Sequence, residues 1–118
     1  MTSALYQEKA HEFADYPVPV NEGKTATALM RYTYPVMGLC EEAGEVAGKF
    51  AKALRDDEGF ITPERKEQIT KELGDVLWMV AEIATLLNVP LGDIMEQNIE
   101  KLESRRSRGV IHGSGDNR

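Results

Sequence analysis

The sequence predicts an all-α protein: an antiparallel helical bundle of about four helices, completed by homo-oligomerisation. Two observations predict this class. Apolar residues recur at three- and four-residue spacing over long segments, which is the period of a helix, and strand-like alternation is not found. Prolines and glycines interrupt the chain between these segments, as expected for short connections between helices.

Length and composition favour a single domain covering residues 1–118. The chain has 118 residues, of which 42% are hydrophobic and 29% are charged, and this suits one domain with an ordinary core. The net charge of −6 disfavours a nucleic-acid partner. The lone Cys40 cannot form an internal disulfide, the N-terminus has no signal-peptide pattern, and no apolar segment is long enough for a membrane span. We therefore expect a cytoplasmic protein that binds neither nucleic acid nor membrane.

The first two helices follow from start and stop signals. The first is expected over residues 3–15, where the two prolines of "YPVP" stop it, and residues 17–26 are expected to form a loop. Pro35 suits the first position of the second helix. This helix is expected to run to about Arg55, where "DDEG" ends it.

The last two helices have equally clear limits. Thr62 is expected to cap the third helix, with Pro63 at its first position, and the helix continues to about Leu87. "NVP" then interrupts the chain, and the fourth helix is expected over roughly residues 91–108. Residues 109–118 contain three glycines and no apolar period, so we expect a tail that is flexible or covers the substrate.

The second and third helices each combine an apolar stripe with an acidic flank. At about 100° per residue, Glu42 and Glu45 lie about 60° and about 120° to one side of the stripe. Glu72 and Asp75 have the same offset from the stripe of the third helix. Both stripes are expected to face the core. They consist of Val36, Leu39, Ala43, Val46, Phe50 and Leu54 in the second helix, and of Ile69, Leu73, Val76, Val80, Ile83 and Leu87 in the third.

The acidic flanks are expected to meet. A link of about six residues favours an antiparallel helical hairpin, in which flanks rotated in the same sense end on the same side. Four carboxylates about 4 to 6 Å apart would raise one another's pKa values, so a cation is expected among them. An all-oxygen cage suits Mg²⁺, with Mn²⁺ as a substitute, whereas zinc would favour His or Cys ligands.

These motifs, in this order, resemble a known family. "EEAGE" at 41–45 and "ELGD" at 72–75 look like the EExxE…ExxD signature of the MazG-like, all-α nucleoside triphosphate pyrophosphohydrolases. "NIEKLESR" at 98–105 looks like the family's Asn-x-x-Lys-x-x-x-Arg segment, and "RGVIHGSGDNR" at 108–118 is similar to a tail of small bacterial and phage members. The resemblance covers about residues 34–118.

The resemblance implies Mg²⁺-dependent hydrolysis of nucleoside or deoxynucleoside triphosphates between the α and β phosphates, giving a monophosphate and pyrophosphate. Metal ligands would be Glu42, Glu45, Glu72 and Asp75. Glu41 and Glu42 would be catalytic, with Glu41 accepting the proton of the attacking water or binding an outer ion. The substrate would be bound by Asn98, Lys101, Arg105 and Arg108, with help from Arg106.

Two alternatives stay open. A related all-α pyrophosphohydrolase would act on another nucleotide pyrophosphate. A non-enzymatic helical interaction protein would use the acids to bind a basic partner. A single run of charged residues is usually a solvated helix surface. Basic residues near a helix C-terminus stabilise the helix through its dipole, so they do not by themselves indicate a ligand.

Trp78 is the basis for the expected oligomer. It lies about 180° from the apolar stripe of the third helix, and with Leu77, Met79 and Leu86 it makes that helix apolar nearly all round. Four helices do not easily cover such a surface, so we expect a homodimer or homotetramer with the third helix in its interface. Base recognition is left open by the sequence. Candidates for stacking on a base, for most of which core packing is the favoured role, are Tyr6, Phe13, Tyr16, Tyr32 and Tyr34.

Overall fold

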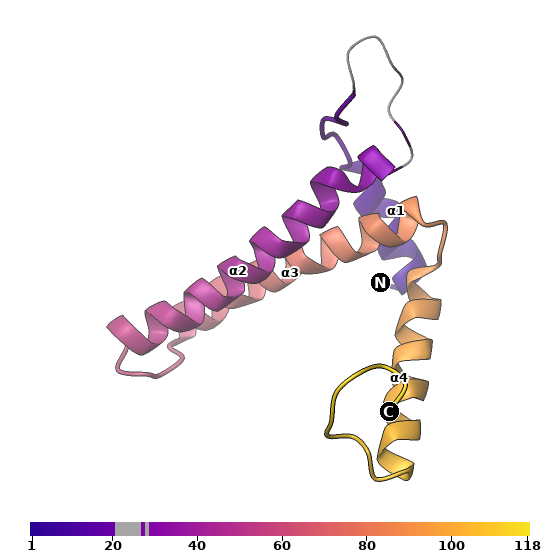
Figure 1. The fold of residues 1–118 in the computed structure, drawn as a ribbon. Coiled ribbons are helices and arrows are strands. Elements are labelled where there is room, and N and C mark those ends of the chain that lie inside the picture. The colour runs from indigo at the N-terminus through magenta and orange to yellow at the C-terminus, as the bar shows by residue number, and fades with distance from the viewer. Residues whose placement is uncertain (21–26, 28) are drawn as a thin grey trace.

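The computed structural model describes residues 1–20, 27 and 29–118, and the secondary structure in these ranges is entirely helical (Figure 1). Four packed α-helices are present there, which confirms the predicted all-α class. No single described helix is long and apolar enough to cross a membrane, although α3 and α4 pass that test together by length and composition, as a pair bent by 106°. The elements are α1 (Ser3–Glu12), the 3₁₀ turn η1 (Leu29–Tyr32), α2 (Thr33–Asp56), α3 (Pro63–Leu86) and α4 (Leu91–Ser107).

The longest part of the molecule is the antiparallel hairpin of α2 and α3 (Figure 1). Its turn is closed as the sequence predicts, because Thr62 Oγ1 accepts a hydrogen bond from the Arg65 amide at 3.1 Å and Pro63 opens α3. Arg65 Nε also donates to Asp57 Oδ2 at 2.8 Å across the turn. Gly59 has φ +81°, a left-handed conformation that glycine adopts without steric cost. These contacts fix the short connection that makes the two helices antiparallel.

Small residues form the centre of the hairpin. The buried residues of α2 are Pro35, Gly38 and Ala53. A Cβ added to Gly38 would lie 2.7 Å from Met79 Sδ, so the missing side chain is what lets α2 approach α3 at this level. The line of contact on α2 is therefore rotated away from the predicted apolar stripe and toward the acidic flank.

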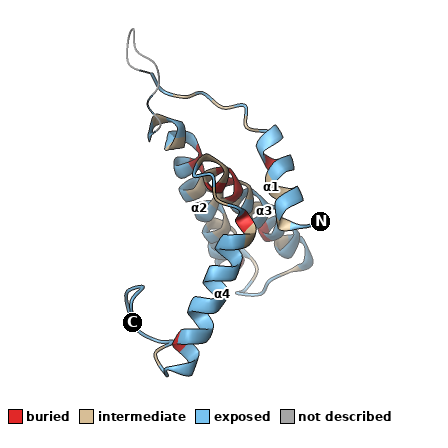
Figure 2. Ribbon diagram, turned by 90° about the vertical axis from the view of Figure 1, so that its right-hand side faces the viewer, coloured by how far each residue is buried: buried red, intermediate tan, exposed pale blue. Residues whose placement is uncertain are grey.

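The prediction that both apolar stripes face the core is wrong for several positions. The reason is the direction of α4, which bends 106° away from α3 and makes no contact with α2 among the described residues. One side of the hairpin is consequently uncovered by the described chain, and Figure 2 draws α4 and much of α2 as exposed. Stripe residues with at least 45% of their surface exposed are Val36, Phe50, Leu54, Leu73 and Leu87.

The open shape is visible in the overall dimensions. The accessible surface is 8766 Å², whereas a compact monomer of this mass exposes about 6,400 Å². The radius of gyration is 17.8 Å, against about 13.5 Å for a compact domain of this length. A single copy therefore leaves much more surface exposed than a chain of this size ordinarily does.

Helix α1 packs against the C-terminal half of α3 (Figure 1). Trp78 Nε1 donates to the Ala10 carbonyl at 3.0 Å, and Trp78 packs against the buried Ala10 and Ala81. Met79 is 3% exposed and meets α2 at Gly38. The expectation that Trp78 and Met79 need a partner copy to cover them is corrected here, because α1 and α2 of the same chain cover them.

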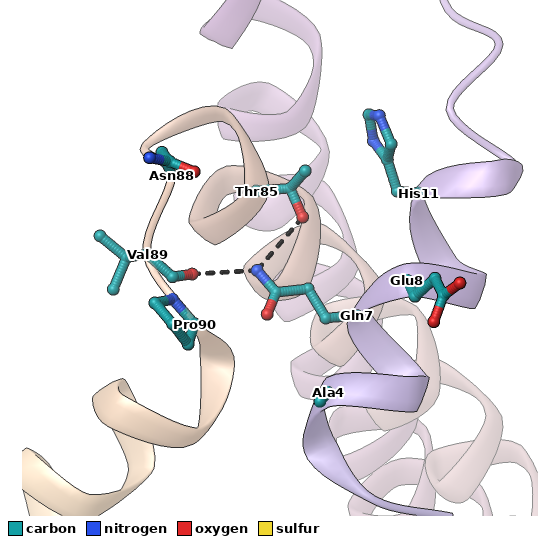
Figure 3. Close-up of a pocket in the computed structure, with 8 residues that line it drawn as sticks. All are labelled: Ala4, Gln7, Glu8, His11, Thr85, Asn88, Val89 and Pro90. Carbon is teal, nitrogen blue, oxygen red and sulfur yellow. Dashed lines mark hydrogen bonds between the residues drawn. The ribbon is translucent and has the colours of Figure 1, made fainter.

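Gln7 ties α1 to the joint between α3 and α4 (Figure 3). Its Nε2 donates to Thr85 Oγ1 at 3.2 Å and to the Val89 carbonyl at 3.0 Å. Its Oε1 accepts from the Leu91 amide at 2.8 Å. Pro90 lies at the N-cap of α4 and makes no side-chain cap, and Gln7 accepts from the first of the amides at this helix end that have no partner within the helix. Helix α1 thus helps to set the direction in which α4 leaves the hairpin.

The helix boundaries agree with the predicted ones to within three residues. Helix α1 ends at Glu12 because the chain already turns there, with the Phe13 amide bonding to the Ala10 carbonyl at 3.2 Å. Helix α2 begins two residues before Pro35, directly after η1. Residues 17–20 of the predicted loop are non-helical, and residues 21–26 lie outside the described residues.

Candidate metal site on the helical hairpin

Three carboxylates from two helices meet at one edge of the hairpin. Glu42 comes from α2, and Glu72 and Asp75 come from α3; one oxygen of each lies within 4.8 Å of the other two. Because α2 and α3 run antiparallel side by side (Figure 1), these residues lie close together although they are far apart in the sequence. We call these three residues the acidic cluster. Their convergence is the geometry that the matched acidic flanks predict.

The acidic cluster is electrostatically unfavourable when it is ionised without a cation. Partial burial raises the pKa of Glu42, and the charge of Asp75 followed by those of the neighbouring carboxylates raises it further. Burial and the charge of Asp75 also raise the pKa of the Tyr6 phenol, which places α1 close to the same edge. A divalent cation would reverse the effect on Glu42, because it favours the ionised carboxylate.

Lys49 is a cation at this edge that the sequence reasoning missed. Its Nζ lies 2.9 Å from Glu72 Oε1 and 3.4 Å from Glu45 Oε2. Glu45 was predicted as a fourth metal ligand, but here it stands outside the acidic cluster, half exposed and paired with Lys49. Glu41, the other predicted catalytic acid, is exposed on α2. The i,i+4 spacing of Glu45 and Lys49 was the signal that could have identified this pair.

The four residues predicted to bind substrate do not lie at the acidic cluster of their own chain. Three of them belong to α4, and the fourth, Arg108, is its C-cap; α4 points away from the hairpin (Figure 1). Helix α4 has no contact with α2 in the described ranges. Three of the four are exposed and Arg105 is buried; the set is Asn98, Lys101, Arg105 and Arg108.

The cations of α4 instead hold the C-terminal tail, which folds back along the helix (Figure 1). Asp116 Oδ1 accepts from Lys101 Nζ at 3.3 Å and from an Arg105 guanidinium nitrogen at 3.0 Å. These hydrogen bonds, that from Arg105 first, lower the pKa of Asp116. Arg108 similarly donates to the Arg118 carbonyl at 2.7 Å. Oxygen acceptors of the tail therefore occupy the donors that were expected to meet phosphate.

A buried carboxylate, Glu82, organises the segment that follows α1. It is 1% exposed, and its two oxygens meet the Tyr16 hydroxyl at 2.5 Å and His11 Nδ1 at 2.9 Å. Tyr16 stacks on Tyr34 with ring centroids 4.9 Å apart, and burial together with Glu82 raises the pKa of its phenol. Two of the aromatic candidates for base stacking are thus engaged with each other. The sequence offered no pattern that connects these residues.

Comparison with known proteins identifies the family. Residues 32–110, more than half of the chain, match the model of the MazG nucleotide pyrophosphohydrolase domain. The chain is 45% identical over 114 residues to the Gene 37 protein of Mycobacterium phage L5, covering 97% of this chain and 96% of the phage protein. It is 33% identical over 72 residues to the uncharacterised protein YvdC of Bacillus subtilis (strain 168), covering 57% of this chain and 68% of that protein. No solved structure gives a significant match to this chain. The chain belongs to the family of the MazG nucleotide pyrophosphohydrolase domain.

Proposed function

We propose that this protein hydrolyses nucleoside or deoxynucleoside triphosphates between the α and β phosphates, releasing a monophosphate and pyrophosphate in a Mg²⁺-dependent reaction. Membership of the family supports nucleotide pyrophosphohydrolase activity in general. The observation that carries the site is the convergence of Glu42, Glu72 and Asp75 on one edge of the hairpin. Family membership alone specifies neither a triphosphate substrate nor the metal ion.

The donor set suits a hard divalent cation. The acidic cluster consists of carboxylates alone, and these oxygen donors fit Mg²⁺, with Mn²⁺ as a substitute, better than zinc. Glu42, Glu72 and Asp75 would hold the ion, and Glu45 would join them after leaving Lys49. When bound, the ion would draw charge from the phosphate oxygens and favour an ionised attacking water.

The remaining groups of this edge have roles that follow from their contacts. Glu41 is exposed one residue before Glu42, and with Glu42 it would accept the proton of the attacking water. Lys49 is a positioning residue, since its ion pair at 2.9 Å orients the carboxylate of Glu72. It also offsets part of the negative charge that the acidic cluster carries before metal and substrate arrive.

We further propose that the working unit is a homodimer or homotetramer of this single domain. The uncovered side of the hairpin supports association, because the accessible surface of 8766 Å² far exceeds that of a compact monomer. Association would also offer a way to bring α4 of one copy toward the acidic cluster of another. The triphosphate would then replace the tail, residues 109–118, on Lys101 and Arg105 of α4 and on Arg108, its C-cap.

The test is an assay of pyrophosphate release by the full chain with the ribonucleoside and deoxynucleoside triphosphates. With Mg²⁺ we expect equal amounts of monophosphate and pyrophosphate; EDTA should abolish the reaction, and Mn²⁺ should partly restore it. Release of orthophosphate and a diphosphate would contradict cleavage between the α and β phosphates. Turnover confined to other nucleotide pyrophosphates would support the related hydrolase, and no turnover at all would favour an interaction protein.

A further inference from the structure

A cavity between α1 and α3 opens directly beside the acidic cluster. Its volume is about 490 Å³, which lies in the range of small-molecule sites. Asp75 belongs both to the cavity wall and to the acidic cluster. A molecule whose charged end is held by the acidic cluster can therefore place an adjoining group in this cavity.

The walls are suited to a flat, largely apolar ring with a polar rim. Tyr6 and Phe13 come from the side of α1, and Trp78 comes from α3. The bond from Trp78 Nε1 to the Ala10 carbonyl fixes the indole ring, so this wall is rigid. Phe13 keeps 71% of its surface exposed, which leaves an aromatic side chain available at the cavity. Aromatic side chains stack on nucleobases because every base has a π-face.

Lys9 adds a hydrogen-bond donor to the same cavity. An ammonium group offers donors and no acceptor, so it matches the carbonyl oxygens and ring nitrogens on the rim of a base. The lysine lies on α1 three residues after Tyr6, so these two side chains share one face of the helix. Phe13 directly follows the last residue of α1 and lines the same cavity.

Gly74 lies at the wall that α3 contributes. Glycine inside a helix is destabilising relative to alanine, so its presence there calls for a reason. Close packing is not the reason, because a Cβ added to Gly74 would have no described atom within 4 Å. The space above Gly74 is part of the cavity, and a larger side chain at this position would fill it.

We propose that this cavity binds the nucleobase of the substrate, with Tyr6, Phe13 and Trp78 packing on the ring and Lys9 donating a hydrogen bond to its rim. The proposal rests on the proposed function for the position of the phosphates. Helix α1 precedes residues 32–110, which match the family model, so the family match does not supply most of these residues. The base preference of this chain would accordingly be set in large part by its own N-terminal helix.

Trp78 provides a direct reporter, since it is the only tryptophan in the sequence and lies in the cavity wall. Its fluorescence should change when the full chain with Mg²⁺ is titrated with GTP, ATP, CTP, UTP or dTTP, corrected for nucleotide absorbance. Inorganic tripolyphosphate, which lacks a base, should cause little change. Gly74→Leu should abolish the nucleotide response and lower kcat/KM at least about tenfold, because it fills the space of the ring.

The matched control is Gly44→Leu, which places the same side chain at an exposed helix position that also has no described atom within 4 Å. It should leave the nucleotide response unchanged. Should Gly74→Leu fail to fold by circular dichroism, Phe13→Ala and Lys9→Met decide instead, since both alter exposed side chains. Each should weaken the nucleotide response, and Lys9→Arg should retain more of it than Lys9→Met.

The outcomes separate the two proposals. If folded Gly74→Leu hydrolyses nucleotides at the wild-type rate and keeps the fluorescence response, the proposed base site is wrong. The proposed function is not affected by that result. If Gly74→Leu changes the oligomeric mass but not the affinity for nucleotides, the proposed base site is also wrong, because the cavity would then hold a side chain of a second copy. A Trp78 response to nucleotides without any pyrophosphate release supports the base site while rejecting the hydrolysis.

Discussion

The two edges of the α2–α3 hairpin differ in chemistry: one gathers negative charge and the other exposes apolar side chains. On one edge lies the acidic cluster, where partial burial and then the charges of neighbouring carboxylates raise the pKa of Glu42, and where Lys49 offsets part of the negative charge. On the other is an apolar edge, which we define as Phe50 and Leu54 of α2 with Leu73 and Leu77 of α3, exposed by 50%, 76%, 52% and 44%. The acidic edge carries negative charge that Lys49 compensates only in part, and the apolar edge carries exposed apolar surface.

Neither deficit is met by the described chain itself. Like charges at close range favour a bound cation, whereas exposed apolar surface favours burial against another surface. We therefore propose that the acidic edge binds a ligand and that the apolar edge mediates association; between them lie the buried residues Pro35, Gly38 and Ala53 of α2. Substitutions on one edge should disturb metal chemistry, and substitutions on the other should disturb assembly.

The largest effect is expected at the acidic edge. Asp75→Asn and Glu42→Gln each keep the shape of the side chain but remove a charge from the proposed metal site. Each should lower Mg²⁺-dependent pyrophosphate release at least about 100-fold, because the ion stabilises the charge of the transition state. Pyrophosphate release should be measured alongside the helical circular dichroism signal, which should not change.

Glu67→Gln is the control for these two variants. It removes an acid from the same helix, but Glu67 is exposed and paired with Lys71 at 2.8 Å, away from the acidic cluster. Its activity should match that of the wild type. Equal losses in all three variants would show that general charge, and not the acidic cluster, controls the reaction.

Most of the acidic edge can be predicted from the sequence. The convergence of Glu42 with Glu72 and Asp75 was predictable, because a short link makes the helices antiparallel and the angular offsets of the acids match. Lys49 was predictable in principle from its i,i+4 spacing to Glu45, since the rule depends only on local helix geometry. Local periodicity thus supplied the helices and most of the acidic edge.

The apolar edge shows where that reasoning stops. Apolar stripes usually face a hydrophobic core, which is why the stripes of α2 and α3 are expected to be buried. Which side of the hairpin is actually covered depends on the direction of α4. That direction depends on Gln7, which bonds to residues more than 75 positions later, and no spacing rule connects them. The pairing of Glu82 with Tyr16 and His11 is likewise a long-range contact. For the same reason the cavity beside Asp75 could not be predicted from periodicity.

A smaller effect is expected at the apolar edge. Leu54→Lys places a charge on the most exposed residue of this edge and should weaken self-association on the order of 10- to 100-fold, because the lost burial of a leucine is worth about 1.5–3 kcal/mol. Sedimentation at micromolar concentration should then show more of the 13.2 kDa monomer than the wild type shows. Gln68→Lys adds the same single positive charge at an exposed position near the same end of the hairpin without removing apolar surface. A wild-type chain that is itself a monomer would remove the basis for an association edge.

The smallest expected effect is a pH dependence of thermal stability caused by Glu42 at the acidic edge. Because the folded-state pKa of Glu42 is raised above its ordinary value of 4.5, ionisation of this group opposes folding. Its contribution to stability is fully present below the unfolded-state pKa and is lost as the pH rises through the raised pKa. In EDTA, the Tm of the wild type should therefore fall over this window relative to that of Glu42→Gln.

Adding Mg²⁺ should reverse this difference above the raised pKa, since the cation favours the ionised carboxylate and binds the folded state. Glu67→Gln serves as the control of opposite sign, because the hydrogen bond from Lys71 lowers the pKa of Glu67 and that contribution is lost as the pH falls. If Tm differences between wild type and Glu42→Gln are the same at all pH values, Glu42 does not experience the charges of its neighbours. The acidic edge would then carry no electrostatic deficit, and the contrast with the apolar edge would reduce to the exposure of Phe50, Leu54, Leu73 and Leu77.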